Sequence, residues 1–173
     1  MLFRSGGRRY HAADSYCAAV TACMPGTRAL RRLEVQRCHL ADATVAALMR
    51  ALPLGLEELS VLHSAAEAAT ADALKHKELR SLVALEVSHN PSMGPFLATA
   101  LASMPQLRRL LASACGLTAA AAEALGREAL PRLTALEVLD LSGARLARPR
   151  GWAAIAAGLN PRARASRRGL GLR

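Results

Sequence analysis

The sequence predicts an α/β fold built from stacked strand–helix units rather than around one conventional core. A nine-residue pattern with leucine at its first and fourth positions occurs five times in the chain of 173 residues, and an alanine-rich stretch follows each copy. Hydrophobic residues make up 52% of the chain but aromatic residues only 3%, so Leu, Ala and Val must build the core. Small stacked units fit that composition.

The repeated pattern sets where the strands lie. The five copies read LRRLEVQRC, LEELSVLHS, LVALEVSHN, LRRLLASAC and LEVLDLSGA, and they begin at Leu30, Leu56, Leu82, Leu107 and Leu136. A period of 25 to 29 residues is typical of repeat architectures, in which about three or more units must stack to bury their faces. We expect the fourth-position leucines to be buried in one row: Leu33, Leu59, Leu85, Leu110 and Leu139.

The segments around the first copy have helical spacing. Apolar residues recur on one face of a predicted helix before Pro53: Leu40, Val45, Leu48 and Leu52. The stretch AADSYCAAVTACMPG at residues 12–26 parallels residues 40–55, with Asp14 matching Asp42. It predicts the helical half of a sixth, degenerate unit whose strand is not recognisable.

The later units are less regular. The helix of the second unit is expected to end early, around residues 75–79, and the helix of the third to start near Pro95 as a first-turn proline. The fourth unit carries a helical apolar face before Pro131, made of Leu117, Ala122, Leu125 and Ala129. The last helix is expected to begin near Pro149 and to stop at Pro161.

The ninth position of each copy predicts a structural ladder. It holds small polar or thiol side chains that can satisfy backbone groups of neighbouring turns: Cys38, Ser64, Asn90 and Cys115. A catalytic or metal role for the thiols is the weaker alternative, because the four cysteines form no C-x-x-C pair and have no histidine at zinc spacing. Without a signal peptide or an apolar run of membrane-spanning length, we expect an intracellular, reducing setting with no membrane span.

These residues resemble leucine-rich repeats of the ribonuclease-inhibitor-like type, in which L-x-x-L-x-L-x-x-[N/C]-x-L is followed by a helix. The resemblance covers about residues 28–160. It implies a right-handed solenoid with the form of a shallow arc, with parallel strands on the concave face and helices on the convex face. The predicted organisation is a basic N-terminal segment (residues 1–11), a repeat domain (residues 12–160) and a basic disordered tail (residues 161–173).

The outward positions of the strands supply the candidate binding site. The fifth position reads Glu34, Ser60, Glu86, Leu111 and Asp140, and the eighth reads Arg37, His63, His89, Ala114 and Gly143. Since equivalent residues of neighbouring strands lie about 4.8 Å apart, we select a concave-face site of Glu34, Arg37, His63, Glu86 and His89. The alternative is an ordinary solvated surface of mixed charge. Two histidines alone make a poor metal site, so we expect no metal.

The net charge of +10 is concentrated at the two ends. Residues 1–13 hold three arginines and no acid, and MLFRSGGRRY resembles a mitochondrial transit peptide with cleavage after Tyr10; a frayed terminus is the alternative. The tail carries five arginines and no acid: Arg162, Arg164, Arg167, Arg168 and Arg173. Such a tail can neutralise phosphates, dock on an acidic protein or anionic lipid, or remain solvated.

The sequence contains no phosphate-binding glycine loop and no nucleophile elbow. We therefore expect no catalytic residues, no cofactor and no enzyme. The predicted function is a protein-interaction scaffold, a structural or assembly subunit of a larger complex. We expect that complex to be mitochondrial if the N-terminal segment is a transit peptide, and cytoplasmic otherwise. The alternative is an accessory protein of a ribonucleoprotein that places its basic ends on RNA.

Overall fold

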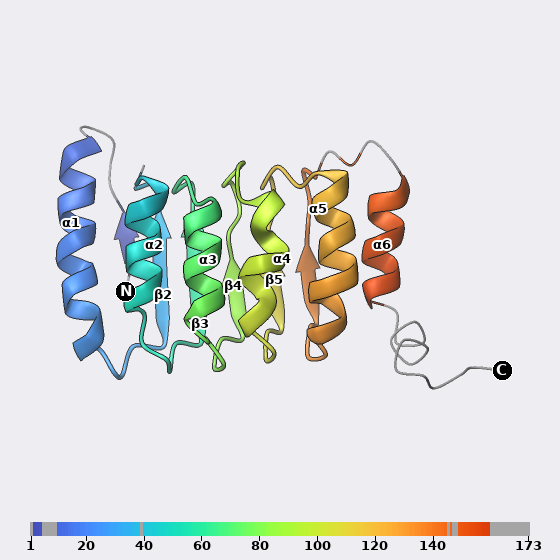
Figure 1. Cartoon of the computed structure of the whole chain (residues 1–173). Helices are drawn as coiled ribbons and strands as arrows, with labels where there is room; N and C mark the ends of the chain where they lie inside the picture. Colours follow the sequence, from blue (N-terminus) through green and yellow to red (C-terminus); the bar gives the residue numbers. More distant parts are fainter. Residues whose placement is uncertain (1, 5–9, 39, 145, 147–148, 160–173) are drawn as a thin grey trace.

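The computed structural model describes residues 2–4, 10–38, 40–144, 146 and 149–159. Its six-stranded parallel sheet follows the order of the sequence, with strands β1 (Leu2–Arg4), β2 (Arg32–Gln36), β3 (Glu58–Leu62), β4 (Ala84–Glu86), β5 (Arg109–Leu111) and β6 (Val138–Asp140). The α-helices are α1 (Tyr10–Cys23), α2 (Asp42–Ala51), α3 (Ala68–His76), α4 (Leu97–Ala100), α5 (Ala119–Ala124) and α6 (Pro149–Leu159). They lie side by side in the same order (Figure 1).

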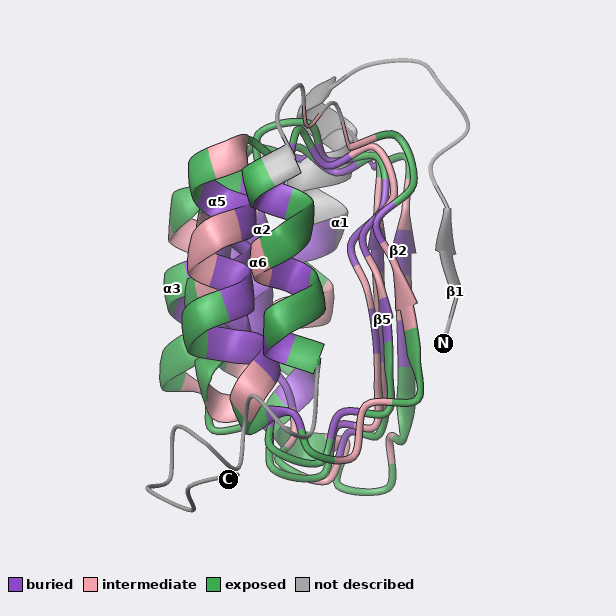
Figure 2. Cartoon of the chain, turned by 90° about the vertical axis from the view of Figure 1, so that its right-hand side faces the viewer, coloured by how far each residue is buried: buried purple, intermediate pink, exposed green. Residues whose placement is uncertain are grey.

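The molecule has two layers. Figure 2 shows the described helices on one face of the sheet, with the buried residues between the two layers. The other face of the sheet carries no described helix, and we call it the open face. Because parallel strands need a crossover segment, each of the helices α1 to α5 returns the chain to the start of the next strand.

The strands pair with the register that the repeats predict. Each strand from β2 to β6 places its fourth-position leucine beside that of its neighbour. Leu33, Leu59, Leu85 and Leu110 are at most 2% exposed, which confirms four of the five predicted core leucines. The prediction for Leu139 is wrong: it is only half-buried, because β6 is the last described strand and no further unit covers it.

The strand of the degenerate unit, which carries no recognisable sequence pattern, lies at the start of the chain. Leu2, Phe3 and Arg4 form β1 and pair in parallel with Glu34, Val35 and Gln36 of β2. Both β1 and the beginning of α1 therefore fall within the segment assigned to the basic N-terminus. Arg8, Arg9 and the whole predicted tail from residue 161 lie outside the described residues.

The helices follow the predicted departures from regularity. Helix α3 ends at His76, α6 begins at Pro149, and the third unit has a short 3₁₀ turn, η2 (Gly94–Phe96), before α4. Another 3₁₀ turn, η1 (Met24–Gly26), follows α1, and η3 (Leu101–Ser103) follows α4. After α5 the chain widens into a π-helical segment, η4 (Leu125–Ala129), and then tightens into η5 (Leu130–Arg132).

Candidate functional site

The predicted arginine–histidine column lies at the turns that follow the strands. Arg37, His63 and His89 have backbone φ angles of 50°, 48° and 60°, and their equivalents Ala114 and Gly143 have angles of 52° and 74°. This left-handed region is uncommon for residues other than glycine. The eighth position adopts it in five units because each strand leaves the sheet through the same turn. The three larger side chains are all exposed at this edge.

Two members of this column contact each other directly. The imidazole rings of His63 and His89 stack with their centroids 4.4 Å apart and an angle of 6° between their planes. The separation of neighbouring strands is close to the distance between two stacked aromatic rings. Equivalent positions after β3 and β4 therefore bring the two imidazole rings face to face. The result is one flat aromatic pair above the ends of β3 and β4.

The acidic residues of the predicted site lie in the middle of the open face, on β2 and β4. Ser60, between them on β3, donates its hydroxyl proton to Oε2 of Glu86 across 2.8 Å. The side chain of Gln36 donates to Oε1 of Glu34. Both carboxylates are half-buried and oriented by these neighbours. The structure therefore places Glu34 and Glu86 on the same surface as the eighth-position residues. Each carboxylate, however, bonds to a side chain of its own strand or of the equivalent position in the neighbouring strand.

An ion-pair network at the start of the strands was not selected from the sequence. The Glu58 carboxylate forms ion pairs with the guanidinium groups of Arg32 on β2, at 3.2 Å, and of Arg109 on β5, at 3.0 Å. Arg109 reaches Glu58 across the intervening strand, where Ala84 occupies the equivalent position and leaves room. We call Arg32, Glu58 and Arg109 the third-position network.

The second position of the repeats, one residue before this network, also carries opposite charges in neighbouring units. Arg31 pairs with Glu57 at 3.4 Å, and Arg108 pairs with Glu137 at 2.9 Å. Exposed pairs of this kind contribute little stability one by one, but they fix where long side chains lie. Opposite charges at the same position of neighbouring units were the sequence signal that could have revealed both rows.

The open face changes character toward β6. The fifth position becomes Leu111 on β5, and the third becomes Val138 on β6, whose exposed fraction is 44%. The eighth position shrinks to Ala114 and Gly143. A polar half over β2–β4 thus adjoins a more apolar half over β5–β6.

The ninth-position ladder is confirmed in part: Asn90 and Cys115 bond to backbone groups of the preceding unit, whereas the Ser64 hydroxyl donates to the Leu62 carbonyl of its own turn. Asn90 is fully buried; its amide nitrogen donates to the carbonyl groups of Val61, Val87 and Ser88, and its oxygen accepts the amide protons of Ser64 and Ala66. The thiols of Cys38 and Cys115 donate to Gln36 and Val87 carbonyl oxygens at 3.2 Å and 2.9 Å.

Burial makes the Cys115 thiol a poor nucleophile. Desolvation raises its pKa to about 11, against a smaller opposing effect of a hydrogen bond with the backbone of Asn90. The thiolate, which is the reactive and metal-binding form, is therefore scarce near neutral pH. Within the part of the chain that the structure describes, no three His, Cys, Asp or Glu residues gather where they could hold a metal ion.

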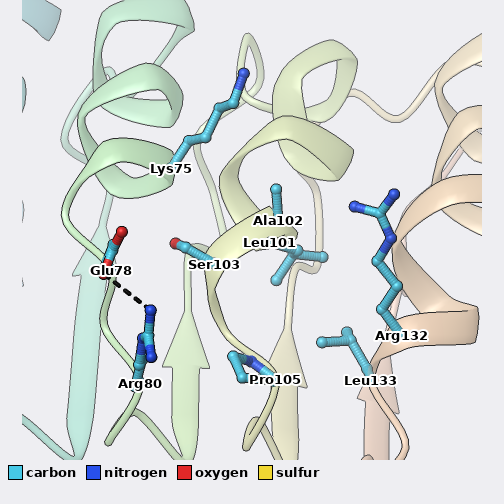
Figure 3. Close-up of a pocket in the computed structure, with 9 residues that line it drawn as sticks. All are labelled: Lys75, Glu78, Arg80, Leu101, Ala102, Ser103, Pro105, Arg132 and Leu133. Carbon is cyan, nitrogen blue, oxygen red and sulfur yellow. Dashed lines mark hydrogen bonds and ion pairs between the residues drawn. The ribbon is translucent and has the colours of Figure 1, made fainter.

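A hollow of about 450 Å³ opens in the helix layer, among α3, η3 and η5 (Figure 3). Lys75, Arg80 and Arg132 line it together with Glu78, and Glu78 pairs with Arg80 at 3.2 Å. Its remaining walls are made mainly of apolar side chains and Ser103, whose hydroxyl donates to the Leu74 carbonyl at 3.0 Å. This surface lies on the opposite side of the molecule from the predicted site.

Comparison with known proteins identifies the fold alone. No family model matches the sequence, and no curated protein matches it. Among solved structures, the chain is similar to the tropomodulin C-terminal domain of Caenorhabditis elegans, with a TM-score of 0.59 and 14% identity over 94% of this chain and 97% of that one. The fold is leucine-rich-repeat-like. None of the described helices is both long enough and apolar enough to span a membrane.

Proposed function

We propose that the chain is a non-enzymatic protein-interaction module that binds its partner through the open face of β2–β4, as a structural or assembly subunit of a larger complex. The observation that carries this proposal is the fixed arrangement of polar side chains there. The third-position network, the Ser60–Glu86 hydrogen bond and the His63–His89 stack all join residues of different units. A surface organised before binding loses less side-chain entropy on association.

The arrangement favours a partner segment that crosses the strands. Such a segment would meet Glu34, Ser60 and Glu86 in succession, with Arg37 and the two histidines along one side. Repeat proteins commonly bind through extended surfaces of this kind, which combine equivalent positions from successive units. The partner would therefore need both cationic and anionic groups, spaced by about one strand separation of roughly 4.8 Å.

We further propose that the open face is the concave side of a right-handed, shallow arc of ribonuclease-inhibitor-like repeats. Units of 25 to 29 residues and the Cys38–Ser64–Asn90–Cys115 ladder support that type. Small-angle scattering of the purified chain tests the arc, because a flat stack and a curved one of equal mass differ in their distance distributions.

The binding proposal is tested by photo-crosslinking the partner and comparing two matched double variants. Arg37→Glu with Glu86→Lys reverses one cation and one acid on the open face and should abolish capture. Arg50→Glu with Glu128→Lys makes the same net change at exposed helix-layer positions and should leave capture intact. Both proteins are first checked for an unchanged thermal midpoint.

Two results would contradict the proposal. Loss of capture in the helix-layer variant alone would move the interface to the helices. Capture of bulk RNA in place of a protein, weakened steeply by salt and by replacing the five tail arginines with alanine, would favour the ribonucleoprotein alternative.

We also propose a mitochondrial location for the complex, on the basis of the arginine-rich N-terminal sequence. A reporter fused to residues 1–25 should enter mitochondria and should lose that location when Arg4, Arg8 and Arg9 become alanine. Cleavage after Tyr10 would remove β1 and leave the edge of β2 unpaired. The N-terminus of mature protein from the organelle tests this cleavage, because it should begin after Tyr10. A diffuse reporter would contradict this part of the proposal.

A further inference from the structure

The C-terminal end of the sheet carries an apolar groove. A cavity of about 350 Å³ lies between β6 and α6, lined chiefly by Leu139, Leu141, Ala144, Trp152, Ile155 and Leu159. Trp152 and Leu159 are 45% and 36% exposed there. An uncovered apolar edge is a pairing and aggregation hazard that proteins normally cover.

The backbone of β6 is also arranged to accept another strand. Val138 donates its amide proton to Arg108 at 2.9 Å, and the Asp140 carbonyl accepts that of Ala112 at 2.8 Å. Both therefore bond toward β5. Because alternate residues of a strand direct their backbone groups to opposite edges, those of Leu139 point away from β5, and so does the amide of Leu141, the residue after β6. In the described sheet β6 is the last strand, so these groups form its outer edge. The Leu141 carbonyl accepts the amide proton of Ala144 at 3.2 Å.

The sequence beyond α6 contains a segment that matches this edge. Residues 169–173 read GLGLR, and Leu170 and Leu172 have the two-residue spacing of Leu139 and Leu141. Leu170 follows Leu139 by 31 positions, whereas Leu139 follows Leu110 by 29. The segment therefore stands where one more unit would place the fourth and sixth positions of its strand.

The connection is long enough. Helix α6 ends at Leu159, at the end of the molecule where the strands begin (Figure 1). Residues 160–168 then give nine connecting residues, whereas residues 52–57 are sufficient between α2 and β3. Nine residues can span up to about 30 Å, well beyond the one step needed to reach the far side of β6.

We propose that residues 169–173 add a seventh parallel strand to the outer edge of β6 and place Leu170 and Leu172 in the groove. In this register Leu170 lies beside Leu139 and Leu172 beside Leu141. Arg168 then lies beside Glu137, which Arg108 already approaches from the other side at 2.9 Å. The short strand β1 closes the opposite end of the sheet in a comparable way. Under this proposal residues 169–173 form a strand in place of the disordered segment that composition predicts.

The single tryptophan of the chain provides a direct test, because Trp152 lines the groove. We expect acrylamide to quench its fluorescence weakly in the full-length protein and more strongly in the Leu170→Asp, Leu172→Asp double variant. The control, Arg162→Ala with Arg164→Ala, changes the same tail outside the proposed strand and should behave like wild type. Equal quenching in wild type and the aspartate variant would overturn the proposal.

Hydrogen exchange tests the pairing itself and reports whether the variant folds. The amides of Leu139 and Leu141 should be protected in the full-length chain and lose that protection in the aspartate variant, while the amides of β4 remain protected. Fast exchange at Leu139 and Leu141 in the intact chain would overturn the proposal. Protection that rises with protein concentration would also overturn it, because a second copy would then cover the groove.

Discussion

Asn90 connects two units more extensively than any other polar side chain in the ninth-position ladder. One buried amide group bonds to three carbonyl groups and two amide protons, contributed by the second and third units. Because these backbone groups are buried, water cannot replace the amide if it is removed. The residue therefore holds two turns in register, which is the reason for a small polar side chain at this position.

Replacing Asn90 with alanine should lower the free energy of unfolding by at least about 3 kcal/mol, since several buried backbone groups lose their partner at once. Cys38→Ser is the matched control, because it alters the same position of another unit and keeps a donor for the Gln36 carbonyl. Denaturant unfolding measures both. A cost for Asn90→Ala no greater than that of the control would show that the ladder contributes little.

Asp42 links neighbouring units through a helix end. Its carboxylate accepts the amide protons of Glu67, Ala69 and Thr70 at 2.8 to 3.0 Å, and the Thr70 hydroxyl at 2.6 Å. Partial desolvation raises its pKa, but these hydrogen bonds together outweigh it, so the pKa lies below the ordinary value of 3.8. The first turn of α3 is thus capped by the preceding unit.

Asp42→Ala should lower the free energy of unfolding by about 1–3 kcal/mol near neutral pH, as the loss of a charged N-terminal cap does. Because the folded pKa is depressed, this contribution is present above the ordinary pKa and disappears as pH falls through the folded one. The difference in stability between wild type and variant should therefore shrink as the pH falls below the ordinary value of 3.8. Asp72→Ala, at an exposed ion pair with His76, should change stability little. A pH-independent difference for Asp42→Ala would contradict the capping role.

At the scale of elements, two helices approach closely because glycine occupies both sides of the contact. A Cβ on Gly126, in the π-helical segment η4, would lie 2.2 Å from the Ala154 carbonyl oxygen of α6. One on Gly158 would lie 2.3 Å from the Gly126 oxygen. The widened turn of η4 therefore brings its backbone against α6, which in turn forms one wall of the C-terminal groove.

Gly126→Ala should force these backbones apart and cost about 1–3 kcal/mol, as overpacking of a tight contact does. It should also alter the emission of Trp152, which lies on α6. Gly26→Ala is the control, since nothing lies within 4 Å of its added methyl group, and it should change stability by less than about 0.5 kcal/mol. Equal thermal midpoints for the two variants would mean that the contact is not tight in solution.

The elements show what sequence can and cannot predict in such a chain. The strands from Arg32 onward and their register follow from leucine spacing, because a two-residue period leaves only one way to bury Leu33, Leu59, Leu85 and Leu110. The strand β1 was missed because LFR is too short to carry a pattern. The π-helical widening after α5 was missed because the spacing of Leu125 and Ala129 equally suits a regular helix.

The candidate site was only partly predictable, for a related reason. Equivalent positions placed Glu34, Glu86 and the His63–His89 pair on one surface. The Arg109–Glu58 bridge spans two strands and depends on the small side chain of Ala84, which a comparison of adjacent units does not reveal. Position eight was predicted as an outward strand position, whereas its left-handed φ angles place it in the turn.

At the scale of the whole molecule, the two faces of the sheet have different roles. Helices cover one face and bury its leucines, while the open face carries side chains that are already paired across units. The described body between the basic ends is nearly neutral, so its rows of alternating charge, rather than a net potential, would select the partner. This division of roles favours the open face as the binding surface.

Hydrogen exchange of the captured complex tests whether the partner binds the open face. Binding should slow exchange in peptides that cover β2–β4 and their following turns, within residues 32–37, 58–63 and 84–89, and should leave α2 and α3 unchanged. Protection confined to the helix layer, or around the hollow lined by Lys75 and Arg132, would contradict the account, because the partner would then lie on the opposite side of the molecule.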